Sequence, residues 1–303
     1  MSPRDDAPFG QGPIAARVLR GAIVAASATL GHLPTGAAHG LAAVVSTVEW
    51  TVRPGKRRRL AENLCHALGL PPDDPAVRGL VRREVRNEGR RSVDLLWALA
   101  NPDELRATTS MEGLEHIADA LARGRGVLLV STHVGGWEVA TSLARELVPV
   151  RTTAVVTDDW IAWAVENLRA RAGLGIVYDS EPVSKAARLL RDGEAILVLG
   201  DYAKDGMRTY PVRLLDAIAE LPAGPVTLSR LCGAPIVPFS VLPRAPRRWW
   251  VQVERPLWPP PRDAGEAGER VLLQALADRW TVTLREHAEH WAAVYPMTWR
   301  EAS

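Results

Sequence analysis

The stretch that decides the fold is Gly-Arg-Gly-Val-Leu-Leu-Val-Ser-Thr-His-Val-Gly-Gly-Trp-Glu, residues 124–138. Its four consecutive apolar residues, 127–130, are typical of a strand that is buried on both faces of a sheet. A turn follows at Gly135 and Gly136, and residues 139–147 are then predicted to form a helix. A buried strand, a turn and a helix in this order indicate a βα unit.

The same alternation recurs towards the C-terminus. We predict strands over 151–156, 175–178, 195–199, 235–241 and 249–253, and helices over 159–172, 184–191, 225–231 and 266–291. The first hundred residues instead predict successive helices, including one over 76–100 after the proline-rich segment 71–75.

The predicted fold class is α/β: a mixed, largely parallel sheet flanked by helices, with an N-terminal helical prelude. We predict a flexible N-terminus over 1–12 and a single domain over 13–300. Within that domain the helical prelude is expected over 13–110 and the α/β core over 111–300.

The composition excludes several classes of protein. The chain has 303 residues, of which 47% are hydrophobic and 24% charged, as in an ordinary globular protein. Its 37 Lys and Arg residues nearly balance 35 Asp and Glu residues, which argues against a nucleic-acid partner. Two cysteines, Cys65 and Cys232, provide no disulfide framework, so a reducing compartment is expected.

The N-terminal helices bear on membrane contact. The apolar run after Arg20 ends near Leu33, short of the roughly 20 residues that a spanning helix needs. A second mild run, 36–48, precedes the basic cluster 56–59. Two weakly amphipathic helices with cations nearby can lie in a membrane interface, or they can pack as core helices beneath a solvated surface.

Polar residues follow two of the predicted strands, at the sheet edge where α/β proteins bind ligands. His133 follows 127–130 and Asp201 follows 195–199. Glu138 is expected in the first helical turn, where it can accept one ring N–H of His133 and leave the other nitrogen as a base. The alternative is a structural histidine. No serine nucleophile accompanies the pair, so the substrate's own hydroxyl or amine is the expected nucleophile.

Residues 131–138, Ser-Thr-His-Val-Gly-Gly-Trp-Glu, resemble the H-x-G-N-W-E/D segment of the bacterial lipid A late acyltransferase family, which includes phosphatidylinositol mannoside acyltransferases. The H-x4-D/E pattern is shared more widely with glycerolipid acyltransferases. Further similar blocks follow in the family's order, so that the resemblance extends over about residues 13 to 300: Arg171 before Gly173 and Gly175, then 190–201, 222–228, 233–238 and 287–291.

The resemblance implies transfer of a fatty acyl group from an acyl-CoA or acyl carrier protein thioester to a hydroxyl of a membrane lipid or glycolipid. It makes His133 the general base and Glu138 its orienting partner. The predicted substrate-binding residues are Arg171, Asp201, Gly135, Gly136 and Trp137. The guanidinium of Arg171 can steady an oxyanion, a donor phosphate or an acceptor headgroup. Asp201 can hold that arginine or bind acceptor hydroxyls. A purely structural ion pair involving Arg171 and Asp201 is the alternative, with equal weight.

No metal or redox cofactor is expected. His287 and His290 have a spacing that can bind metal, but no third ligand lies near them in the sequence. We expect the enzyme to lie at the cytoplasmic face of the cell membrane, bound peripherally, or in the cytoplasm.

The chain departs from the family pattern on the expected acceptor side. Gly136 replaces an Asn that is frequent in the family, residues 157–159 lack the expected Glu, and Tyr202 replaces a Gln or Arg. These departures leave the identity of the acceptor substrate undecided. A tailoring acyltransferase that acts on a soluble secondary metabolite and a non-catalytic lipid-binding protein are the alternatives.

Overall fold

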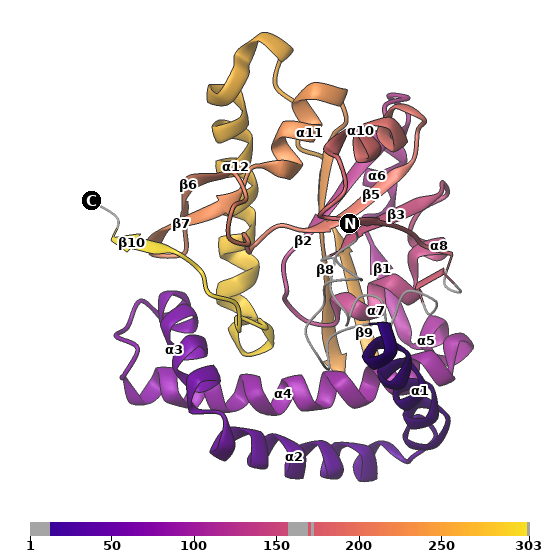
Figure 1. Ribbon diagram of the computed structural model, residues 1–303, viewed down its shortest axis with the longest axis vertical. Coiled ribbons are helices and arrows are strands. Elements are labelled where there is room, and N and C mark those ends of the chain that lie inside the picture. Colours follow the sequence, from indigo (N-terminus) through magenta and orange to yellow (C-terminus); the bar gives the residue numbers. More distant parts are fainter. Residues whose placement is uncertain (1–12, 157–168, 171–172, 302–303) are drawn as a thin grey trace.

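Strand β2 (Val127–Ser131) lies at the centre of a seven-stranded sheet. A computed structural model describes residues 13–156, 169–170 and 173–301. The strand order is β1-β9-β8-β2-β5-β3-β4 (Figure 1). The other strands are β1 (Thr109–Glu112), β3 (Thr152–Val156), β4 (Gly175–Tyr178), β5 (Ala195–Leu199), β8 (Ile236–Ala245) and β9 (Arg248–Val253).

The sheet is mixed and largely parallel, as the sequence predicts. β2 pairs in parallel with β5 and β8, and β3 pairs in parallel with β4 and β5. β9 runs antiparallel to β8, and β1 runs parallel to β9. The carboxyl ends of β2, β3, β4, β5 and β8 therefore lie at one edge of the sheet.

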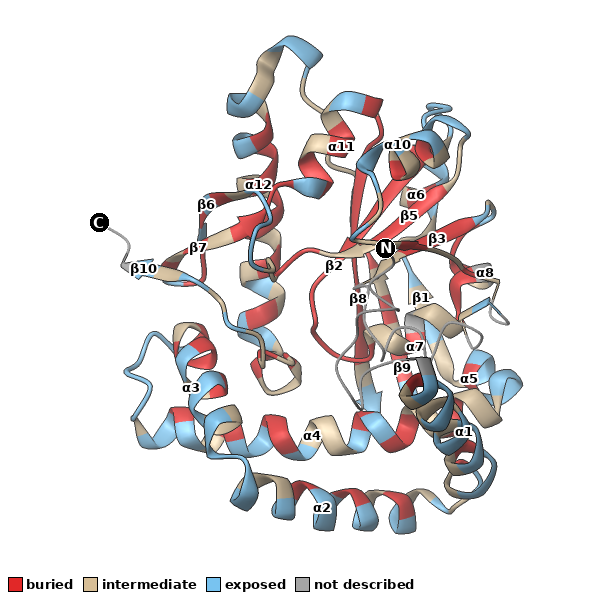
Figure 2. Cartoon of the chain, viewed as in Figure 1, coloured by how far each residue is buried: buried red, intermediate tan, exposed pale blue. Residues whose placement is uncertain are grey.

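Strand β2 is buried along its whole length (Figure 2), and its two faces pack into two different cores. Leu128 and Val130 pack with residues of α10 (Val183–Arg191), α11 (Gly224–Cys232) and α12 (Gly265–Glu286). Val127 and Leu129 pack with residues of α6 (Leu114–Leu121), α7 (Trp137–Ser142) and α8 (Ala144–Leu147). Because successive side chains of a strand point to opposite faces, burial on both sides requires an unbroken apolar run.

The N-terminal region is helical, as predicted: α1 (Pro13–Leu30), α2 (Thr35–Val52), α3 (Pro54–Leu68), α4 (Pro75–Ala100) and α5 (Pro102–Thr108). Helix α4 begins at Pro75 because the Asp74 carboxylate caps it, accepting the N–H of Ala76 at 2.7 Å. It contacts α7 and the short turn η2 (Ala288–His290), while α2 packs along it (Figure 1). None of the described helices is long and apolar enough to cross a membrane.

A second, three-stranded antiparallel sheet was not predicted. It consists of β6 (Thr209–Leu214), β7 (Ala217–Pro222) and β10 (Trp299–Glu301) in the order β10-β7-β6. Buried residues alternate along β6, where Tyr210, Val212 and Leu214 face the core. The chain between β5 and α11 thus forms a hairpin that packs against α12.

Several element bounds differ from those expected. The helix predicted over 139–147 is divided into α7 and α8, and the last long helix ends at Glu286. β8 continues to Ala245 and turns into β9 at Arg247, whose φ is +57°. The N-terminus 1–12 and most of the helix predicted over 159–172 lie outside the described residues, and the single domain stays a prediction.

Candidate active site

Strand pairing brings His133 and Asp201 together. β2 and β5 are parallel neighbours, and Ser131 at the end of β2 is in register with Leu199 at the end of β5. The residues two positions beyond each strand therefore meet at the same edge of the sheet. Nδ1 of His133 lies 2.7 Å from Oδ1 of Asp201, and the backbone N–H of His133 donates to Oδ2 at 3.0 Å. Both side chains are buried.

Trp291 completes the surroundings of this carboxylate. Its indole Nε1–H donates to Oδ2 of Asp201 at 2.9 Å, and its side chain is fully buried. Burial alone would raise the pKa of Asp201, but His133 and the three hydrogen bonds outweigh it, so the pKa lies below its ordinary value. Asp201 is therefore an ionised, buried hydrogen-bond acceptor at neutral pH.

An ionised carboxylate can only accept, so Nδ1 of His133 carries the proton in this pair. Nε2 is then the ring nitrogen that can take a proton from a substrate. Within the described part of the chain, no other residue hydrogen-bonds to Nε2, and the side chain keeps 11% exposure. This is the geometry that a general base requires.

Glu138 lies where it was predicted, in the first turn of α7, but it does not hold the ring. No hydrogen bond joins its carboxylate to His133 among the described contacts, and Asp201 occupies that role. The expectation that Glu138 orients the imidazole is therefore wrong, because the turn between them leaves Glu138 beside the ring, whereas strand pairing brings Asp201 into bonding distance. Burial raises the pKa of Glu138, although a hydrogen bond from its own backbone amide and the electrostatic effects of Arg91 and His133 act to lower it.

Gly135 and Gly136 shape the loop rather than offer amides to a ligand, contrary to expectation. The N–H of Gly135 donates to the carbonyl of His290 and that of Gly136 to the carbonyl of Val241, each at 2.8 Å. Gly135 has a φ of +67°, and a Cβ there would lie 2.0 Å from the Val241 oxygen. A Cβ on Gly136 would lie 2.4 Å from the Trp249 ring. Close packing thus requires glycine at both positions.

Two aromatic rings lie against the imidazole, and a third stacks on one of them. The Trp137 ring meets the His133 ring edge-on with centroids 5.5 Å apart, and the Tyr295 ring lies 4.5 Å from it. Tyr295 in turn stacks on Tyr202 at 4.6 Å. All three aromatic side chains are half-buried, so they form the walls beside the imidazole.

Arg171 and residues 157–159 lie outside the described residues, so the predicted role of Arg171 stays a prediction. Trp291 and Tyr295 were missed as site residues. The similarity of 287–291 to a family block marked this segment, but the sequence did not show that it returns to the end of β2. In the structure Ala292 N–H donates to the His133 carbonyl at 2.9 Å.

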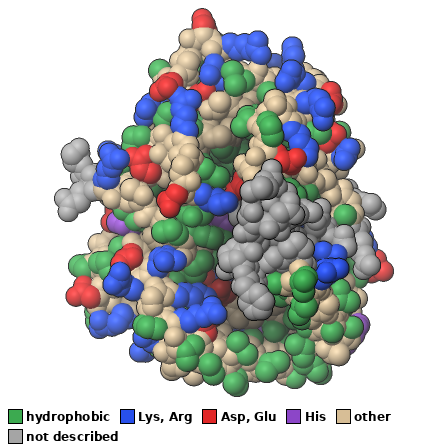
Figure 3. Space-filling view, in the orientation of Figure 1, with side chains coloured by type: hydrophobic (Ala, Val, Ile, Leu, Met, Phe, Trp, Pro, Cys, Tyr) green, Lys and Arg blue, Asp and Glu red, His purple; other side chains and the backbone are tan. Residues whose placement is uncertain are grey.

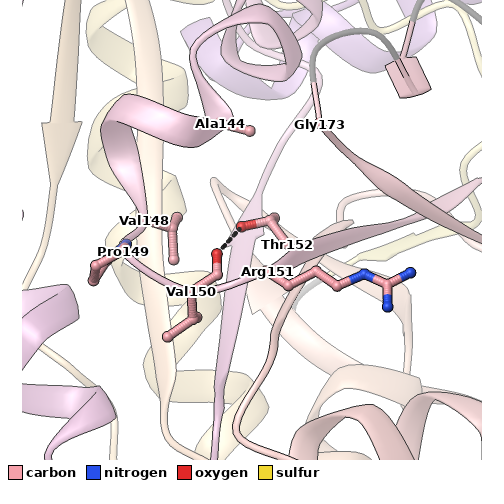
Figure 4. Close-up of a pocket in the computed structure, with 7 residues that line it drawn as sticks. All are labelled: Ala144, Val148, Pro149, Val150, Arg151, Thr152 and Gly173. Carbon is pink, nitrogen blue, oxygen red and sulfur yellow. Dashed lines mark hydrogen bonds between the residues drawn. The ribbon is translucent and has the colours of Figure 1, made fainter.

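Two cavities lie at different places on the sheet. One of about 370 Å³ is lined by Ala144, residues 148–152 and Gly173 (Figure 4). It adjoins the start of β3 and so lies at the amino edge, away from His133. The other, of about 300 Å³, lies between α4 and the β8–β9 hairpin, and its lining includes Trp249 and His290, which contact the 135–136 turn. The second cavity therefore adjoins the loop that follows His133.

Comparisons with known proteins identify the family of the chain. The profile of the family described as bacterial lipid A biosynthesis acyltransferase matches residues 15–296. The chain is similar to phosphatidylinositol mannoside acyltransferases from Mycobacterium tuberculosis, with 26% identity over 262 residues that cover 80% of this chain and 78% of the relative. A protein of the same name from Mycolicibacterium smegmatis is 24% identical over 262 residues, covering 82% and 81%. The chain therefore belongs to the bacterial lipid A biosynthesis acyltransferase family.

Proposed function

We propose that the protein transfers a fatty acyl group from an acyl-CoA or acyl carrier protein thioester to a hydroxyl of a membrane lipid or glycolipid. The observation that carries the proposal is the His133–Asp201 pair, with Nδ1 bonded to a buried carboxylate and Nε2 open. Membership of the family supports an acyltransferase of lipid biosynthesis. The names of the mycobacterial relatives support a phosphatidylinositol-based glycolipid as acceptor.

In the proposed reaction, Nε2 of His133 takes the proton of the acceptor hydroxyl as its oxygen attacks the thioester carbonyl carbon. The new C–O bond forms, and the carbonyl electron pair moves onto the oxygen. Collapse of this oxyanion breaks the C–S bond, and Nε2 returns the proton to the departing sulfur. The products are an ester and a free thiol, and His133 is regenerated without a metal or redox cofactor.

Asp201 supports both proton transfers. While Nε2 carries the extra proton the imidazole is cationic, and the adjacent carboxylate stabilises that charge in a buried, poorly screened setting. The Trp291 indole and the backbone N–H of His133 both donate to Oδ2, which leaves Oδ1 facing the imidazole. We retain Arg171 as the proposed stabiliser of the oxyanion or of a substrate phosphate.

Peripheral contact with the cytoplasmic membrane face is part of the proposal, and helix α2 supports it. Its buried residues are small, Ala38, Ala42 and Ser46, whereas its leucine and valine side chains are exposed. Val44 and Val52, for example, are 63% and 65% exposed. Figure 3 shows hydrophobic side chains along the lower edge of the molecule, where α2 and α1 lie in Figure 1. A soluble helix normally has the reverse pattern, so this face fits a lipid interface.

The basic cluster 56–59 contributes less to that surface than the sequence suggested. Lys56 forms ion pairs with Glu49 and Glu88. Arg57 donates to the backbone of Trp50, and Arg59 donates to the backbone of Val294. Three of these cations therefore support the fold, and the apolar face of α2 carries the membrane proposal.

The function is tested with purified protein, palmitoyl-CoA labelled in the acyl chain, and a total polar lipid extract. We expect label to move into one lipid band, and His133→Ala to abolish the transfer while the far-UV circular dichroism spectrum is unchanged. Transfer to a water-soluble acceptor instead would favour a tailoring enzyme. Full turnover by a folded His133→Ala protein would remove the general base from the proposal.

A further inference from the structure

The groove between α4 and the β8–β9 hairpin carries an inference about what the enzyme binds. It has a volume of about 300 Å³, which is at the lower end of ligand pockets. Its polar lining comes from α2, α4, the hairpin and η2: His39, Asn87, Arg90, Arg91, Asp94, Arg244 and His290. None of these residues belongs to the His133–Asp201 pair.

The charges in this groove are unbalanced towards the positive. Asp94 is the one carboxylate in the described lining, and it is already bonded to His39 at 2.9 Å. Arg91 is paired with the buried Glu84 at 2.7 Å. Arg90 and Arg244 are exposed and have no ion-pair partner among the described residues. Arg244 is one of the lining residues, and its guanidinium lies over the Trp250 ring, 3.9 Å from the ring centroid, which restricts its orientation.

Buried polar atoms without partners point to a missing occupant. Nε1 of Trp249 and Nδ1 of His290 belong to lining residues, are shielded from solvent and lack a hydrogen-bond partner among the described residues. Nε of Arg247, whose guanidinium faces Asp94 at 3.9 Å, is in the same state. Because nearly all buried polar groups in proteins are satisfied, the Trp249 indole N–H in the lining, with the Arg247 N–H beside the lining residue Asp94, suggests a ligand with acceptor oxygens. His290 Nδ1 can donate to the same ligand in the tautomer that carries its proton there.

The groove is also connected to the loop that follows His133. The Trp249 ring packs against Gly136, and the carbonyl of His290 accepts the N–H of Gly135. An occupant of the groove would therefore lie against residues that position His133. A substrate group bound there can stay outside the reaction and still hold the reacting part in place.

We propose that this groove binds a phosphate group of a substrate, with Arg90 and Arg244 as its main cationic contacts. Phosphate oxygens suit arginine forks and an indole N–H, and a phosphate keeps its charge at neutral pH. The inference rests on the proposed function only for the choice of source. That source is either the phosphates of an acyl-CoA donor or the phosphodiester of a lipid headgroup.

The test measures equilibrium binding by titration calorimetry, which needs no turnover and is thus independent of the acyl-transfer assay. The probes are inorganic phosphate, coenzyme A and glycerophosphoinositol, with pantetheine and inositol as phosphate-free counterparts. We expect binding of the phosphate probes, weakened about tenfold or more in the Arg90→Gln, Arg244→Gln double variant. Both side chains are exposed, so this variant should keep the fold.

The matched control is Arg188→Gln, an exposed arginine on α10. Loss of coenzyme A binding alone assigns the groove to the donor, and loss of glycerophosphoinositol binding alone assigns it to the acceptor headgroup. The proposal is overturned if the wild type binds no phosphate probe, or if the double variant binds every probe as tightly as Arg188→Gln does.

Discussion

At the scale of single residues, two carboxylates lie near His133, and they differ in their contact with its ring. Asp201 bonds to the ring, whereas Glu138 stays beside it without a bond. We predict that Asp201→Asn lowers kcat by about a hundredfold or more, because the cationic imidazole loses its charged partner. Glu138→Gln should cost less than about tenfold, since Glu138 acts on the ring only through space.

Both variants are compared in the same acyl-transfer assay at saturating donor and acceptor. The thermal unfolding of Asp201→Asn should be measured as well, because the carboxylate also accepts a hydrogen bond from Trp291. An unchanged melting temperature would show that the loss of activity does not come from a damaged fold. The reverse ranking, with Glu138→Gln the slower enzyme, would refute the assignment of Asp201 as the orienting residue.

This pair shows what the sequence can and cannot predict about the site. His133 and Asp201 were found because each follows an apolar strand, a purely local signal. Their contact depends on β2 and β5 being neighbours with Ser131 opposite Leu199. Glu138 is only five residues from His133, so it was the nearer partner along the chain. Asp201 is 68 residues from His133, and the two come together only because their strands are neighbours in the sheet.

At the scale of elements, the turn between β2 and α7 depends on a glycine packed against an indole. A Cβ on Gly136 would lie 2.4 Å from the Trp249 ring, so we predict that Gly136→Ala lowers the free energy of unfolding by about 1–3 kcal/mol. Gly79→Ala is the control, because its Cβ would meet nothing closer than 3.7 Å and helix propensity favours alanine.

Denaturant unfolding of a double-mutant cycle isolates the clash. In a Trp249→Leu background the cost of Gly136→Ala should shrink, since the ring that it strikes is gone. An equal cost in both backgrounds would mean that the strain has another origin. In this chain the Trp249 ring therefore leaves no room for a side chain at position 136, where an Asn is frequent in the family.

Helix α2 supports a second prediction at this scale. Replacing Val44 and Val48, which lie on its exposed face, by Glu should lower partition onto lipid vesicles by about tenfold or more, because a charge replaces apolar area at the interface. Activity on detergent-dispersed acceptor should change by no more than about twofold. The control is Val282→Glu on α12, where the valine is 57% exposed. Equal vesicle binding by all variants would contradict membrane contact through α2.

The small sheet shows why some elements escape prediction. β6 alternates buried and exposed residues, as a half-buried strand should, but the strand contains Pro211 and its hairpin turns at Leu215 and Asp216. Asp216 is a common turn residue, but Leu215 before it is not, and Leu215 adopts a φ of +59°, which leucine rarely does. The alternation was present in the sequence, and the weak turn signal concealed it.

At the scale of the whole molecule, the ends of the chain complete the site. In the segment after α12, the indole N–H of Trp291 donates to Asp201. The same segment is bonded to α3, because the side-chain amide of Asn63 donates to the carbonyls of Ala293 and Tyr295 at 2.7 and 2.9 Å. Asn87 of α4 bonds to the carbonyl of Glu289 at 2.8 Å. The helical prelude therefore holds the segment that bonds to the Asp201 carboxylate, a dependence that no local pattern in the sequence encodes.

That arrangement partly buries His290, and its titration gives the whole molecule a pH dependence. Burial lowers the pKa of His290 from 6.5 to about 4; Arg91, His287 and Arg90 add to this effect and Glu289 opposes it. The folded state thus binds this proton less readily than the unfolded state, so the stabilising contribution is complete above pH 6.5 and is lost as the pH falls towards 4. Relative to His290→Gln, the wild type should lose about 2.5 kcal/mol of unfolding free energy between about pH 7 and 4.5. Urea unfolding of both proteins across this range measures the difference, and parallel curves would show that His290 titrates alike in both states.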